Sequence, residues 1–145
     1  MKLLLLIFVA GMLASVASSQ CVRTVKLKVP AIRGEVWLID EAGEKNIIAA
    51  GAKVSLRKQN EWDKPFFNLK TDSNGRFAIE GVPSGNYVMS VDTDAPVFDN
   101  MTFWVHIVKK TKSNSQDQIT VGLGATNLKS TDSCEGFARV EKQSF

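Results

Sequence analysis

The chain has 145 residues, of which 44% are hydrophobic and 23% are charged, and its formal net charge is +3. The length is that of one ordinary domain. Positive and negative residues are mixed along the sequence, so the charge pattern predicts no nucleic-acid partner and no membrane-binding patch.

The first residues have the order of a secretory signal peptide. Lys2 gives a basic start, an apolar run extends from Leu3 to Ala14, and small residues fill most of positions 15–19. The apolar run is too short to span a bilayer, which needs ~20 residues. We therefore predict a signal peptide over residues 1–19, a mature domain over residues 20–145, and a secreted or periplasmic location without a membrane span.

The chain contains two cysteines, Cys21 and Cys134. In an exported chain such a pair favours a disulfide over free thiols. Closing so long a loop would stabilise the fold by about 4–5 kcal/mol in the chain-entropy model. Gln20 stands where a lipid-attachment site has a small residue, so a lipid anchor is not expected.

The mature region is dominated by short segments in which apolar and polar residues alternate. A period of two is typical of strands with one buried face. Turn residues separate the segments, and 72–75 (Asp-Ser-Asn-Gly) predicts a tight hairpin. The fold class is therefore all-β, a Greek-key sandwich of about seven strands. The predicted strands are 35–40, 52–57, 76–80, 87–92, 103–108, 119–124 and 136–140.

The stretch from Thr71 to Val91 resembles a known signature, T-D-x-x-G-x-F-x-I-x-x-V-P-x-G-x-Y. This pattern is that of carboxypeptidase regulatory-like domains, which are transthyretin-like, or prealbumin-like, β-sandwiches. The similarity extends over roughly residues 33–124. It implies a prealbumin-like sandwich and a role in folding support or binding rather than catalysis, because each position of the signature has a structural reason.

The sequence offers little for catalysis. His106 is the single histidine, no Gly-x-Ser-x-Gly nucleophile motif is present, and a zinc site would need several His or Cys ligands. Hydroxyisourate hydrolases share the transthyretin fold but end in Tyr-Arg-Gly-Ser, whereas this chain ends in Glu-Lys-Gln-Ser-Phe. We therefore predict no enzyme, no metal and no cofactor. The alternative is a small transthyretin-related hydrolase that uses His106.

Aromatic residues cluster between two predicted strands, in the segment 59–68 that contains Trp62, Phe66 and Phe67. Exposed aromatic rings on a loop suit a protein or carbohydrate partner. The alternative is that these rings cap the open end of the core. Trp104 follows an inward-facing Phe103, so it is expected on the outer face of its sheet and is a further candidate for partner binding.

These observations predict an exported, non-enzymatic module that binds a protein or carbohydrate partner or supports a surface assembly. A self-assembling structural subunit is a further alternative, because sheet edges pair readily. Asn100 begins an Asn-x-Thr glycosylation sequon, which matters only in a eukaryotic source. The sequence does not fix the oligomeric state.

Overall fold

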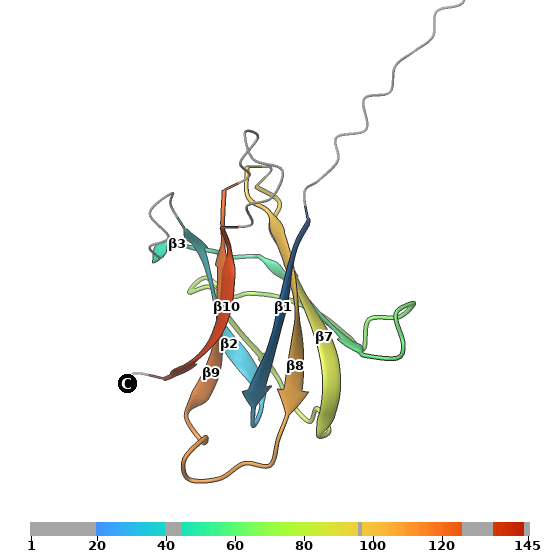
Figure 1. The fold of residues 1–145 in the computed structure, drawn as a ribbon. Helices are drawn as coiled ribbons and strands as arrows, with labels where there is room; N and C mark the ends of the chain where they lie inside the picture. Colours follow the sequence, from blue (N-terminus) through green and yellow to red (C-terminus); the bar gives the residue numbers. More distant parts are fainter. Residues whose placement is uncertain (1–19, 40–44, 96, 126–134, 144–145) are drawn as a thin grey trace, which may run out of the picture.

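The computed structural model describes residues 20–39, 45–95, 97–125 and 135–143. Within these ranges the chain forms ten β-strands in two sheets (Figure 1). The predicted signal peptide lies outside the described residues and stays a prediction. No helix in the described ranges has the length and apolar character needed to cross a membrane.

Each sheet is assembled from strands that are distant in the sequence. The first sheet has the order β1 (Gln20–Val29), β8 (Asn100–Ile107), β7 (Gly85–Asp92), β4 (Lys53–Lys58) and β5 (Phe67–Lys70). The second sheet has the order β10 (Phe137–Lys142), β9 (Asp117–Leu123), β2 (Ile32–Ile39) and β3 (Lys45–Ile48), and β6 (Arg76–Ile79) pairs with the first half of β2. The all-β sandwich expected from the alternation is confirmed.

Strand β1 closes one side of the sandwich. It pairs in parallel with β8, from Gln20 opposite Asn100 to Val29 opposite Ile107. On its other side it lies next to β10 (Figure 1), and the Arg23 guanidinium donates to the carbonyl of Gly136 at 2.5 and 2.8 Å. A second parallel pair, β2 with β9, lies in the other sheet, and the remaining strand pairs are antiparallel.

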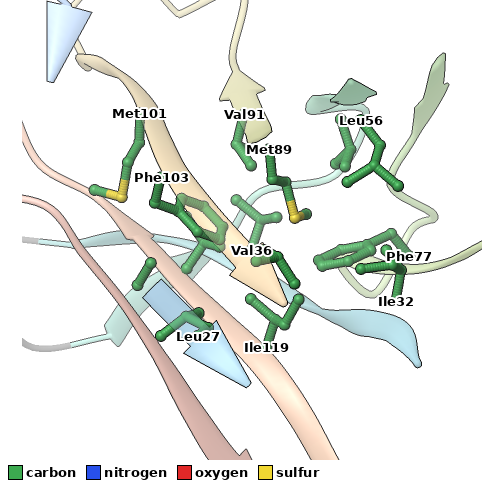
Figure 2. Close-up of a cluster of buried hydrophobic side chains, with 14 of the residues drawn as sticks. Leu27, Ile32, Val36, Leu56, Phe77, Met89, Val91, Met101, Phe103 and Ile119 are labelled. Atoms are coloured by element: carbon green, nitrogen blue, oxygen red, sulfur yellow. The ribbon is translucent and has the colours of Figure 1, made fainter. Parts of the chain in front are cut away.

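The core lies between the sheets and receives the inward-facing positions of both (Figure 2). Burial of apolar side chains at these positions is the main favourable contribution to folding. The inward positions that the alternation predicts in five of the strands are buried: Ala52, Val54 and Leu56; Phe77 and Ile79; Tyr87, Met89 and Val91; Phe103, Val105 and Ile107; Ile119, Val121 and Leu123.

All seven predicted strands are present, and the structure adds β1, β3 and β5. Strand β1 contains an irregularity between Val22 and Lys26, which shifts its register against β8. Its second half, 25–29, alternates apolar residues with lysines, so the sequence did carry a signal for this strand. Strand β3 has the sequence Lys-Asn-Ile-Ile, which does not alternate, and three of the four residues of β5 are exposed, so that β5 has no buried face.

The segment 72–75 forms a tight turn, but it is not a β-hairpin. Its flanking strands, β5 and β6, belong to different sheets. The Asp72 carboxylate accepts backbone bonds from Asn74 (2.8 Å) and Arg76 (2.9 Å), and Gly75 takes a φ of 69°. Sequence chemistry therefore predicted the turn correctly, while the prediction of paired flanking strands was wrong, because turn residues do not say which sheet the next strand joins.

Candidate functional site

The segment of residues 59–66 between β4 and β5, here called the aromatic loop, projects from the sandwich (green in Figure 1). Backbone hydrogen bonds fix its two ends. The amide of Gln59 donates to the carbonyl of Asn86 at 3.1 Å, and the amide of Phe66 donates to the carbonyl of Leu56 at 2.6 Å. The base of the loop is therefore held against β4 and the start of β7.

The aromatic side chains of this region differ in exposure. Trp62 is 58% exposed, Phe66 40% and Phe67 37%. The Phe66 ring packs edge-on against Phe67, with centroids 4.8 Å apart, and its centroid lies 6.1 Å from that of the buried Tyr87. Phe66 therefore partly covers the core next to Tyr87. Trp62 does not cover the core, because its ring takes no part in the aromatic contacts of the described residues.

A cleft of about 420 Å³ lies between the aromatic loop and the turn that connects β6 to β7. Amide, hydroxyl and charged side chains dominate its lining, which consists of Lys58, Gln59, Asn60, Glu61, Pro83, Ser84, Gly85, Asn86 and Tyr87. A second hollow of about 360 Å³ is lined by residues 60–64, so that Trp62 borders it directly.

Tyr87 supports one wall of the cleft. Its side chain is buried, and its hydroxyl donates to the carbonyl of Pro83 at 2.8 Å. Burial raises the pKa of the phenol above its ordinary value, so the hydroxyl stays protonated in neutral solution. Tyr87 therefore holds the 83–86 turn in place.

His106 lies on the outer face of the first sheet, beside the cleft but not in its lining. Nδ1 of His106 is 2.9 Å from Oδ1 of Asn86, which is directly opposite on β7 and does line the cleft. A carboxamide oxygen only accepts hydrogen bonds, so Nδ1 carries the proton of this bond and Nε2 is the nitrogen left for another partner. Asn86 thereby orients the imidazole.

The structure separates Trp104 from the other predicted aromatic residues. Trp104 is half-buried on the outer face, in register with Val88 on β7 and Lys26 on β1. Strand β7 lies between it and β4, from which the aromatic loop begins. The site therefore combines Trp62, Phe66 and Phe67 with polar residues of the cleft, and Trp104 is not part of it.

Sequence reasoning missed the polar half of this site. Gln59 and Asn60 lie in the predicted aromatic segment, but Asn86 comes from β7 and reaches the cleft through strand pairing. The available signal was that Asn86 directly precedes the inward-facing Tyr87 and therefore faces outward. Its position next to His106 follows only from the register of β7 with β8.

Of the two cysteines of the predicted disulfide, the structure describes only Cys21. Cys21 is buried in β1, and no described cysteine is a free thiol. Cys134 lies outside the described residues, so the pairing of Cys21 with Cys134 stays a prediction. Within the described part of the chain no group of three or more His, Cys, Asp and Glu side chains is arranged to hold a metal ion.

Comparison with known proteins gives a structural match without a sequence match. No family model and no curated protein matches the chain. The solved structure of Klebsiella pneumoniae 5-hydroxyisourate hydrolase matches with a TM-score of 0.52 over 80% of this chain and 100% of that chain, at 17% sequence identity. The match therefore reaches the whole of the hydrolase chain.

This match corrects one prediction and confirms another. The prediction that the protein is not an enzyme is wrong as it was drawn, because the matched structure is that of an enzyme. That prediction treated the absence of familiar motifs as the absence of activity, whereas one fold carries both catalytic and binding proteins. The prealbumin-like architecture is confirmed, and at this level of identity the match shows the fold: the chain is a transthyretin-like β-sandwich.

Proposed function

We propose that this protein is an exported domain that binds a partner at the aromatic loop and the adjoining cleft, with carbohydrate as the favoured ligand class. One observation carries the proposal. Trp62, 58% exposed, stands on the projecting loop and borders a hollow next to the polar cleft. Large exposed aromatic side chains beside a concave surface are typical of binding sites.

The chemistry of the surroundings favours a sugar. A tryptophan ring offers a flat apolar face for the C–H face of a pyranose. Gln59, Asn60 and Asn86 carry carboxamides, which both donate and accept and so match the hydroxyl groups of a sugar. A protein partner would also use Trp62 as an anchor, but an apolar rather than an amide-rich cleft would suit it better.

The test is a binding screen of the mature protein on a glycan array, repeated with Trp62→Ala. We expect glycan binding by the wild type and a loss of roughly tenfold or more in the variant, because a central aromatic anchor contributes more than 1.4 kcal/mol. Val97→Ala is the matched control, since Val97 is 60% exposed and lies outside the loop.

Equal binding by wild type and Trp62→Ala would remove the aromatic loop from the proposal. Binding to no glycan, combined with Trp62-dependent capture of one defined extracellular protein, would replace carbohydrate with protein as the partner class. Failure of both assays would reject the function.

A second candidate function is hydrolysis that depends on His106. It is supported by the orientation of the imidazole by Asn86 next to the cleft, and by the match to a hydrolase structure. The assay is the decay of 5-hydroxyisourate, the molecule in the name of the matched enzyme. A His106→Gln variant should lower any rate by about 10²–10⁴ if the ring is a general base, and an unchanged rate would exclude this role.

A further inference from the structure

A positively charged surface lies at the end of the sandwich where β1 and β8 finish. We call it the basic pole and define it as Lys28, Lys109, Lys110 and Lys112. The backbone amide of Val108 donates a hydrogen bond of 2.9 Å to the carbonyl of Val29, which brings the end of β8 next to the end of β1. The three later lysines follow on the loop between β8 and β9, the orange loop at the bottom of Figure 1.

The loop that carries these lysines is held in shape by its own polar side chains. The Asn114 amide group donates to the carbonyl of Lys109 at 3.0 Å, and its Oδ1 accepts from the amide of Thr111 at 2.7 Å. Arg33, from β2, donates to the carbonyl of Ser115 at 2.5 Å. A loop ordered in this way loses little conformational entropy when it binds.

The charge of the basic pole is not neutralised by its neighbours. All four lysines are exposed, and none of them forms an ion pair with a described carboxylate. Asp117, at the start of β9, forms its ion pair with Lys142 and not with a lysine of the basic pole. Clustered unpaired charges of one sign attract ligands of the opposite sign.

A polar row of side chains joins the basic pole to the cleft. Lys28 is opposite His106 in the pairing of β1 with β8, and His106 is opposite Asn86 in the pairing of β8 with β7. These three residues face outward on adjacent strands, and Asn86 lines the cleft. The cleft and the basic pole are therefore two parts of one continuous surface.

We infer that the ligand of this surface is an acidic polysaccharide, with sugar rings at the aromatic loop and carboxylate or sulfate groups at the basic pole. This inference rests on the proposed function and names its substrate class. A polymer fits better than a single sugar because Asn86 in the cleft and Lys28 in the basic pole lie two strand spacings apart, about 10 Å, with β8 between them. An anionic membrane fits less well, because none of the exposed large hydrophobic residues lies on the loop between β8 and β9 that carries three of the lysines.

The experiment measures the affinity of the mature protein for polygalacturonate oligomers and for their methyl esters, which keep the sugar rings and lose the charge. The variant is Lys109→Gln with Lys110→Gln. The control is Lys70→Gln with Arg76→Gln, which removes the same formal charge from two exposed residues that form no ion pair within the described structure. We expect roughly tenfold weaker binding of polygalacturonate by the first variant, little change in the control, and weaker binding as salt increases.

The possible results distinguish failure of this inference from failure of the proposed function on which it rests. Equal affinity for the acid and its ester, wild-type affinity in the Lys109 and Lys110 variant, or no binding of polygalacturonate would overturn the inference. If Trp62→Ala still abolished binding of a neutral glycan, the proposed function would stand without the inference about an acidic ligand. Equally tight binding of polyglutamate or of phosphatidylglycerol vesicles would overturn the assignment to a polysaccharide.

Discussion

Glu141 links three strands on the outer face of the second sheet. Its carboxylate accepts hydrogen bonds from Lys45 on β3 (3.0 Å), from Thr120 on β9 (2.8 Å) and from Arg139 on β10 (2.6 Å). Lys45 also reaches Glu35 on β2 at 3.2 Å. Burial on its own would raise the pKa of Glu141, but the bonds from Lys45, Thr120 and Arg139 outweigh it and hold the pKa below its ordinary value.

The lowered pKa makes Glu141 a source of acid sensitivity. A carboxylate whose pKa is depressed in the folded state contributes stability above its unfolded pKa, and this stability is lost as the pH falls through the folded pKa. We expect Glu141→Gln to lower the free energy of unfolding by about 1 kcal/mol at neutral pH, given the partial exposure of the network. The difference from the wild type should shrink in acid.

Urea unfolding at neutral and acidic pH measures this effect. Glu80→Gln is the control, because Glu80 is exposed and has no ion pair within the described structure. A stability difference that stays constant across the pH range would show that Glu141 acts through packing and not through its charge.

At the scale of strands, the sequence predicts what depends on local pattern. Strands with clear alternation, such as β4, were predicted with their buried face, because burial repeats every second residue. Strand β1 was missed although its second half, 25–29, alternates apolar residues with lysines; the irregularity between Val22 and Lys26 shifts only its register against β8. The order of strands in a sheet depends on long-range pairing, and no local pattern encodes it.

The same limit explains the candidate site. The aromatic residues Trp62 and Phe66 of the loop and Phe67 at the start of β5 stood out because they are neighbours in the sequence. The contact of Asn86 with His106, and the placement of Lys28 beside them, depend on the registers of three strands. Trp104 was a further candidate on the outer face of its sheet, and strand order places it on a part of the surface separate from the loop.

At the scale of the molecule, Cys21 gives a test of how the sandwich is held closed. It is buried in β1, the strand that lies between β8 and β10. If Cys21 is bonded to Cys134, we expect a reducing agent, Cys21→Ser or Cys134→Ser each to lower the free energy of unfolding by about 4 kcal/mol. Denaturant unfolding with thiol titration of the native protein measures this; reactive thiols in the native exported protein would exclude the pairing.

The direction of β1 also determines how the protein can be attached to a support or to a larger assembly. Gln20 pairs with the start of β8, whereas Lys28 pairs with His106 at the end that carries the cleft and the basic pole. The backbone amide of Gln143, the last described residue, donates a hydrogen bond to the carbonyl of Gln116 on the loop of the basic pole. A tether in front of β1 would therefore present the binding surface outward, and a tether after β10 would crowd it.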